Sequence, residues 1–240
     1  MAGKYLYLLM NIGTILFPFL FSFEKKVAFY KSWKCLFPAL LITAIPFIAF
    51  DNLYTSMGVW GFNENYITGF RIFNLPVEEI LFFFTIPYAC LFIYEGLNKV
   101  FPNSLFFDRT KNLISIGMML LCLTLAIIFF DRAYTSVICF AVFLFIGAHA
   151  FIFKSDYMGK FWRFFAVQLI PFVIVNGILT GTAIENSVFW YDPATIINFR
   201  IGTIPIEDLF FALALLLMNV TLFEWFKSRS VVTNKNLVLS

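Results

Sequence analysis

The sequence predicts an all-α, polytopic membrane protein with about seven transmembrane helices, and three observations lead to this class. The chain of 240 residues is 61% hydrophobic and only 13% charged, and it contains 35 phenylalanines. Its mean hydropathy of +0.88 is too high for a soluble domain of this length. Long apolar segments follow one another along the chain, and most of the sequence pattern occurs twice.

Each apolar segment approaches or exceeds the roughly 20 helical residues that cross a hydrocarbon core about 30 Å thick. The first segment has one lysine ahead of it and no small-residue cleavage site, so we expect it to remain in the mature protein. No segment alternates between apolar and polar residues as a membrane-spanning strand would. The expected helices cover about residues 5–23, 35–51, 78–98, 112–130, 134–153, 163–184 and 205–226.

An internal repeat with an offset of 129 residues relates the first three segments to the last three. The sequence NLPVEEILFFFTIPYACLFIYE at Asn74–Glu95 corresponds to TIPIEDLFFALALLLMNVTLFE at Thr203–Glu224. The same offset, extended upstream without a gap, pairs Tyr5 with Tyr134. The fourth segment has no counterpart and links the two copies. The expected domains are a first repeat at 1–100, a linker with the fourth helix at 101–131, a second repeat at 132–228 and a polar tail at 229–240.

The distribution of basic residues predicts how the chain is oriented. Of the 17 lysines and arginines, 13 follow the first, third, fifth and seventh segments. Cytoplasmic loops are enriched in these residues, so we expect a multi-pass protein of the cell membrane with its N-terminus outside and its C-terminus inside. Because one span links the two three-span copies, the repeats are expected to be parallel. The net charge of +3 reflects this asymmetry and does not indicate a nucleic-acid partner.

Cofactor and metal motifs are absent from the sequence. The chain contains no GxGxxG fingerprint of the kind that holds a dinucleotide, so we expect no tightly bound flavin or other cofactor. The four cysteines occur singly and form no CxxC pair, so neither a metal site nor a disulfide framework is expected.

Two acidic pairs, one in each copy, are the strongest indication of function. Each pair follows a proline and precedes a long apolar run. Proline suits the first turn of a helix, where carboxylates lie near the positive end of the helix dipole. The pairs could serve only as helix-terminal charges, but their duplication and the phenylalanines after them favour a functional role. The motif residues are Pro76, Glu78 and Glu79 in the first copy and Pro205, Glu207 and Asp208 in the second.

A carboxyl group beside aromatic rings suits the proton-initiated cyclisation of an apolar polyene. Desolvation raises the pKa of a carboxyl group, whereas the helix dipole and a nearby arginine lower it. A carboxyl group kept protonated in an apolar pocket donates a proton strongly, and aromatic faces stabilise a carbocation without attacking it. Glu78 and Glu207 are the first choice for this acid chemistry, with Glu79 and Asp208 as partners that share the proton. The further candidates are Arg71, Arg200, Trp60, Phe82, Trp190, Tyr191 and Phe211.

These motifs together resemble a known family. PVEE at Pro76–Glu79, PIED at Pro205–Asp208, NGILTG at Asn176–Gly181 and FWYD at Phe189–Asp192 are similar to the small lycopene cyclases that lack a flavin motif. That family occurs as two subunits or as one fused polypeptide, and nearly the whole chain resembles the fused form. The resemblance implies conversion of the ψ-ends of lycopene to β-ionone rings, giving γ-carotene and β-carotene, without net redox change.

The resemblance also implies ligands and further binding residues. Lycopene and its cyclised intermediates would be bound within the lipid bilayer, and other carotenoid enzymes would be partners. Asn176 and Thr180 are expected to line the approach to the acidic groups, with Asp51 and Asn52 as looser equivalents in the first copy. Whether each copy cyclises one end of the substrate or both copies build one site stays open, as does the number of rings formed.

Three other classes of membrane protein have comparable helix numbers. A small-solute transporter with parallel repeats and a linking helix is the main alternative, although the segments are rich in phenylalanine and poor in side chains that bind polar solutes. A retinal-binding photoreceptor would need a lysine in the last helix, and none lies between Glu207 and Glu224. A prenyltransferase would need aspartate-rich metal motifs, which the sequence lacks.

Overall fold

The computed structural model describes residues 3–102, 105–153 and 155–238, with side chains described through residue 230. Seven helices in these ranges are long and apolar enough to cross a membrane. The expected all-α, polytopic class is confirmed. The helices are α1 (Leu6–Phe21), α2 (Trp33–Ser56), α3 (Val77–Val100), α4 (Leu105–Ile128), α5 (Ala133–Gly147, extended by a π-helical segment Ala148–Phe153), α6 (Met158–Leu179) and α7 (Ile206–Val238).

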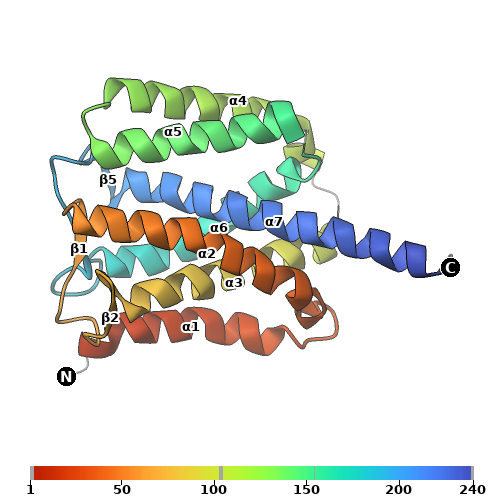
Figure 1. The fold of residues 1–240 in the computed structure, drawn as a ribbon, viewed down its shortest axis with the longest axis horizontal. Coiled ribbons are helices and arrows are strands. Elements are labelled where there is room, and N and C mark those ends of the chain that lie inside the picture. Colours follow the sequence, from red (N-terminus) through yellow and green to blue (C-terminus); the bar gives the residue numbers. More distant parts are fainter. Residues whose placement is uncertain (1–2, 103–104, 154, 239–240) are drawn as a thin grey trace.

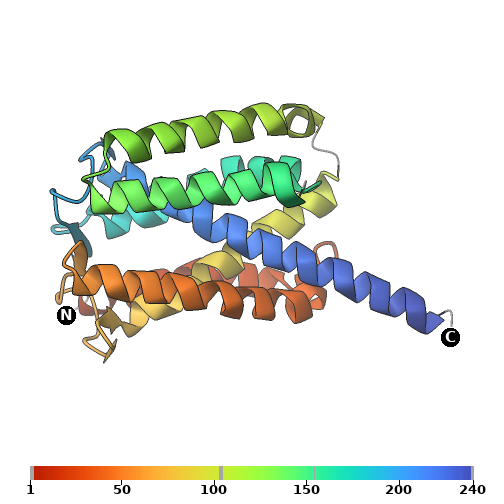
Figure 2. The same cartoon turned by 45° about the horizontal axis from the view of Figure 1, so that its top comes forward.

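The helices form one bundle and run roughly along its longest axis (Figures 1 and 2). Helices α3 and α7 both begin at the end of the bundle where the N-terminus lies and run in the same direction. Helix α1 packs against α3, and α5 packs against α7. The second helix of each copy also crosses to the other copy, because α2 packs against α7 and α6 packs against α3. The two copies therefore share one interlocked core.

Three helix boundaries differ from the expected ones. Helix α4 begins at Leu105 rather than near residue 112. Helix α6 ends at Leu179 rather than near residue 184, because Gly181 adopts a positive φ of 116° that terminates the helix. Helix α7 continues to Val238 through most of the expected polar tail. Residues 103–104 of the expected linker and 239–240 of the tail lie outside the described residues.

Short strands that the sequence did not predict lie between the second and third helices of each copy. Two of the pairs are hairpins that lead directly into α3 and α7. Pro76 and Pro205 therefore end these hairpins and precede the helices, instead of lying in the first helical turn. The strands of the described residues are β1 (Trp60–Phe62), β2 (Arg71–Ile72), β3 (Leu75–Pro76), β4 (Phe189–Tyr191), β5 (Arg200–Ile201) and β6 (Ile204–Pro205).

The strand pair β1–β4 joins the two copies across the end of the bundle. The strands are antiparallel, with Trp60 opposite Tyr191 and Gly61 opposite Trp190. The Trp190 ring lies so close to Gly61 that a Cβ atom at residue 61 would be 2.3 Å from its Cζ2 atom. Only glycine fits at this crossing, which holds Trp60 and Tyr191 side by side over the bundle.

The repeat offset of 129 residues does not extend into the first helix. The Tyr7 hydroxyl donates a hydrogen bond to Glu79, and the Tyr134 hydroxyl donates one to Asp208. Because Glu79 and Asp208 are equivalent in the repeat, Tyr7 and not Tyr5 is the counterpart of Tyr134. The expected pairing of Tyr5 with Tyr134 is wrong, since the spacing from Tyr134 to Trp162 in the second copy is two residues longer than the spacing from Tyr7 to Trp33 in the first.

Ionic contacts tie α3 to α7 at the end of the bundle opposite the strands. The Lys227 ammonium lies 2.8 Å from the Glu95 carboxylate of the other copy and 3.8 Å from Glu224 on its own helix. The Tyr94 hydroxyl also donates to Glu224, at 2.9 Å. With the β1–β4 pair at the other end, these contacts hold the two third helices at fixed positions relative to each other.

Candidate active site

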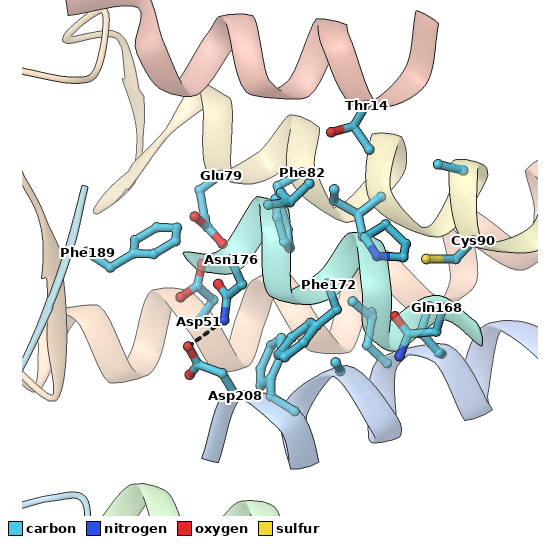
Figure 3. A pocket seen from close by; sticks show the side chains of 18 of the residues that line it. Thr14, Asp51, Glu79, Phe82, Cys90, Gln168, Phe172, Asn176, Phe189 and Asp208 are labelled. Carbon is cyan, nitrogen blue, oxygen red and sulfur yellow. Dashed lines mark hydrogen bonds between the residues drawn. The ribbon is translucent and has the colours of Figure 1, made fainter. Parts of the chain in front are cut away.

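A cavity lies within the bundle and receives side chains from α1, α2, α3, α5, α6 and α7 and from the strands β1 and β4. Its empty volume is about 1020 Å³, including the part that opens to the outside. Along α3 the wall runs from Glu79 to Ile93, which is about 21 Å at 1.5 Å per residue. Figure 3 shows carboxyl groups at one end of the cavity, whereas the remaining wall is mostly apolar. The cavity is therefore a long apolar slot with an acidic end.

Three carboxyl groups face the acidic end of the slot. Glu79 comes from α3, Asp208 from α7 and Asp51 from α2 (Figure 3). All three side chains are buried, with Asp51 only 3% exposed. Consecutive residues of a helix point about 100° apart, so only the second residue of each acidic pair reaches the cavity. Carboxyl groups from both copies therefore meet in one site.

The first residue of each acidic pair lies outside the cavity and accepts a hydrogen bond from the loop before its helix. Glu78 and Glu207 are fully buried. A Glu78 oxygen accepts the backbone N–H of Thr68 at 2.7 Å, and a Glu207 oxygen accepts that of Ile197 at 2.7 Å. Thr135 on α5 also donates to Glu207, at 2.6 Å. The structure thus places the two glutamates that were the first choice for acid chemistry in equivalent loop-bracing positions.

Asp208 has the most hydrogen-bond donors of the three cavity carboxyl groups. Asn176 and Tyr191 donate to its Oδ2 atom at 3.0 and 2.8 Å, and Tyr134 donates to Oδ1 at 3.2 Å. Burial, followed by the charge of Asp208, raises the pKa of the Tyr191 hydroxyl well above its ordinary value, so this phenol stays a donor. Because three donors converge on it, the ionised form of Asp208 is well solvated by the protein.

Among the described residues, Glu79 and Asp51 each receive one hydrogen-bond donor, on one carboxyl oxygen. The Tyr7 hydroxyl donates to Glu79 Oε2 at 2.6 Å, and the Trp60 indole N–H donates to Asp51 Oδ1 at 2.6 Å. The Asp51 Oδ2 atom is buried and has no hydrogen-bond partner among the described residues. The charged form of Asp208, with three donors, is thus more strongly stabilised by hydrogen bonds than that of Glu79 or Asp51.

Aromatic rings surround the acidic end of the slot. Phe82 and Phe211, both expected from the sequence, lie one turn beyond Glu79 and Asp208 on the same helices and line the cavity. Trp60 packs edge-on against Tyr134, with ring centroids 4.9 Å apart. The π faces of such rings stabilise positive charge within about 6 Å. The other aromatic lining residues are Phe62, Phe172, Phe189 and Tyr191.

The two arginines expected beside the acidic pairs do not line the cavity. Arg71 forms an ion pair with Glu64 and donates to the Asn74 carbonyl, at the outer surface. Arg200 makes the equivalent backbone contact in the second copy, and its guanidinium lies 5.7 Å from the centre of the Tyr191 ring. Arg200 therefore lies behind Tyr191, which lines the cavity, and Arg71 is more distant.

Two other residues expected at the site also lie outside its wall. The Trp190 side chain covers Gly61 and is 49% exposed. The Thr180 hydroxyl donates to the Asn176 carbonyl and closes the end of α6. Asn176, which the sequence grouped with Thr180, does line the cavity and contacts Asp208.

Three tyrosines donate to the cavity carboxyl groups, and sequence reasoning found Tyr191 but missed Tyr7 and Tyr134. Tyr134 was noted only as a repeat position, and Tyr7 was hidden by the two-residue change in offset. Asp51 was noted only as a loose equivalent of the NGILTG region. A search for polar residues that interrupt apolar segments would have found Asp51, because it lies near the end of a span that is otherwise free of acidic residues.

Comparison with known proteins identifies one family. A family model described as lycopene cyclase matches two stretches of the chain, residues 4–97 and 131–226. The two matches begin 127 residues apart and end 129 residues apart, in agreement with the offsets seen in α1 and in the later helices. No curated protein and no solved structure shows a significant match.

Proposed function

This chain belongs to the lycopene cyclase family, and we propose that it converts the ψ-ends of lycopene to β-ionone rings by proton-initiated cyclisation. The observation that carries this proposal is the acidic end of the slot, where three carboxyl groups lie within an aromatic wall. A proton added at C2 leaves a tertiary cation at C1, and the C5=C6 double bond then attacks C1. Loss of a proton from C6 completes the ring, so the reaction needs no electron acceptor.

Glu79 is the proton donor in this proposal. Its carboxyl group faces the cavity, and Tyr7 is the one donor to it within the described part of the chain. With one oxygen free of hydrogen bonds among the described residues, the neutral acid can present its proton to a bound alkene. Crowding of carboxyl groups in an apolar cavity favours keeping one of them protonated. Glu78 has the role of holding the loop before α3 and thus of positioning Glu79.

Asp208 is the carboxylate that balances the charge of the cation. Asn176, Tyr134 and Tyr191 donate to it and hold it in the ionised form. A fixed negative charge in a water-excluded site stabilises a developing cation strongly. The rings of Phe82 and Phe211 add π density without a nucleophile that could capture the cation.

In this proposal the chain has a single active site, which closes one ring at a time. Glu79 comes from the first copy and Asp208 from the second, yet both face the same cavity. A molecule with two rings therefore arises from two successive reactions, with the second end entering after the first has left. The monocyclic product is an obligatory intermediate.

The apolar part of the slot holds the polyene next to the reacting end. Ala89 on α3 is buried and lines this part of the wall. Replacing Ala89 with tryptophan is expected to lower ring formation at least about tenfold, as a steric cost of roughly 1.4 kcal/mol on binding would produce. The rate of lycopene loss in membranes containing equal amounts of protein measures this effect.

Ala166 provides the matched control for the slot. It is exposed on α6, facing away from the cavity. The Ala166→Trp variant adds the same bulk and should retain the parent rate. An Ala89→Trp variant that is as active as the parent would show that the polyene does not occupy the slot.

Production of the chain in a bacterium that accumulates lycopene tests the function itself. γ-Carotene and β-carotene, resolved by chromatography, are the expected new pigments. Persistence of lycopene alone, with the protein inserted in the membrane, would contradict the proposal. In that case the transporter alternative would be tested by solute flux in vesicles, although the apolar wall of the cavity does not favour it.

The charge distribution supports a location for the site within the cell membrane. Loops rich in lysine and arginine lie at the end of the bundle opposite the acidic groups, as expected for the cytoplasmic side. This orientation places the N-terminus and the acidic end of the slot at the outer side. The substrate, which is insoluble in water, would then reach the slot from the lipid.

A further inference from the structure

We infer that Asp51 is the base that removes the ring proton, and that its position selects which ring isomer is released. This inference rests on the proposed cyclisation, because it concerns the last step of that reaction. Asp51 lies outside both duplicated acidic motifs. Its repeat counterpart, Thr180, closes the end of α6 and does not line the cavity. Asp51 is therefore a feature of the first copy alone.

The surroundings of Asp51 leave one oxygen available to the substrate. The side chain is only 3% exposed and lines the cavity next to Glu79 and Asp208 (Figure 3). Trp60 donates to Oδ1 at 2.6 Å and fixes the orientation of the carboxyl group. The Oδ2 atom is buried without a partner among the described residues. A buried acceptor left unsatisfied costs about 1–3 kcal/mol, and a cationic intermediate in the cavity would relieve this cost.

The other two cavity carboxyl groups are less suited to take up the proton. Both oxygens of Asp208 already accept hydrogen bonds from the protein, which makes this carboxylate a weaker base. Glu79, like Asp51, accepts one hydrogen bond at 2.6 Å, but in the proposed reaction its free oxygen lies against C2, where it has just delivered its proton, and not against C6. Asp51, with a free oxygen and a single fixed donor, can approach a C–H bond without first breaking a contact.

The proposed reaction conserves protons and electrons without a group from outside the cavity. After ring closure the positive charge is at C5, and three kinds of neighbouring C–H bond can lose a proton. The electron pair of the C6–H bond forms the C5=C6 double bond of the β-ring, while its proton moves to Asp51 Oδ2. Loss from C4 would give an ε-ring, and loss from the methyl group on C5 would give an exocyclic double bond. Asp51 then returns the proton to Glu79, which restores the starting state.

Trp60 is a positioning residue for this step. Its indole donates to Asp51, and its backbone pairs with that of Tyr191 in the β1–β4 strand pair. Tyr191 in turn donates to Asp208. The strand pair thus sets the spacing between the proposed base in the first copy and the charge-stabilising carboxylate in the second.

The test replaces Asp51 with asparagine and resolves the ring isomers formed in a lycopene-accumulating bacterium. Asparagine keeps the size of the side chain and can still accept the Trp60 hydrogen bond, but it cannot take up a proton. We expect a loss of roughly 10²-fold in ring formation at equal protein amount. We also expect ε-rings or exocyclic double bonds in the residual product. The Asp51→Glu variant, which restores a base at a shifted position, should recover activity with an altered isomer ratio.

Asp131 gives the matched control, because its side chain is exposed beyond the end of α4 and lies outside the cavity. The Asp131→Asn variant should form β-rings as the parent does. The inference is overturned if Asp51→Asn makes β-rings at the parent rate. It is also overturned if the activity falls but the residual rings keep the parent isomer ratio in both Asp51 variants. Absence of rings from the parent chain would instead refute the proposed function.

Discussion

Replacing Glu79 with glutamine is expected to abolish ring formation while leaving the protein folded in the membrane. Glutamine has nearly the same shape and can accept the hydrogen bond that Tyr7 donates to Glu79. It cannot donate a proton to an alkene. Removing a general acid typically slows a reaction by roughly 10²–10⁴-fold. The rate of lycopene loss in isolated membranes, divided by the amount of inserted protein, measures the effect.

Glu78 provides the matched control for this variant, because it is the neighbouring carboxyl group and does not line the cavity. The Glu78→Gln variant loses the charge of the acceptor that holds the Thr68 N–H. Hydrogen bonds to charged groups contribute about 1.5–3 kcal/mol, so less folded protein is expected, with substantial activity per molecule. Full activity of Glu79→Gln together with an inactive, well-folded Glu78→Gln would reverse the assignment.

Replacing Asp208 with asparagine is expected to eliminate monocyclic and bicyclic products together. Both copies contribute to one site, so the loss of the charge-balancing carboxylate cannot be compensated by the first copy. Asparagine would also present an amide donor to Asn176, Tyr191 or Tyr134, all of which donate to Asp208 in the structure. Removal of one electrostatic stabiliser costs roughly 10²–10³-fold in rate. The amounts of lycopene, γ-carotene and β-carotene after a fixed time give the result.

Asp192 is the matched control for this second variant. It is an aspartate of the same copy, and its side chain accepts a backbone hydrogen bond from Ala194 outside the cavity. The Asp192→Asn variant should make both products. Accumulation of γ-carotene by Asp208→Asn at the rate of the parent would mean that the first copy works alone, and that there are two independent sites.

Most of the fold could be predicted because hydropathy and the repeat act over long stretches. A run of some twenty apolar residues forms a helix across a bilayer, because a helix satisfies its own backbone hydrogen bonds. The duplication, with one span between the copies, implied that the copies are parallel. The strands were missed because each contains only two or three residues. The β1–β4 pair also depends on a contact between the copies, the Trp190 ring over Gly61, which local sequence patterns do not contain.

The acidic motifs could be found from the sequence, but the residue that faces the cavity could not. Glu78 and Glu79 differ by about 100° around α3, and the direction of the cavity depends on how α3 packs against α1 and α6. Because Glu78 and Glu207 are identical in the two copies, the sequence favoured them as the acids. The structure shows that they are equivalent, but both accept hydrogen bonds from the loops before α3 and α7. Asp51 reaches the site only because α2 packs beside both third helices.

The most direct test of the proposed reaction is the deuterium content of the product formed in heavy water. The purified chain would be placed in liposomes with less than one molecule of lycopene per protein molecule, so that each protein turns over about once. One deuterium at C2 of the new β-ring is the expected result, because the proton added there comes from an exchangeable carboxyl group. Cyclic product with no deuterium at C2, or no cyclic product, would contradict proton-initiated cyclisation by this chain.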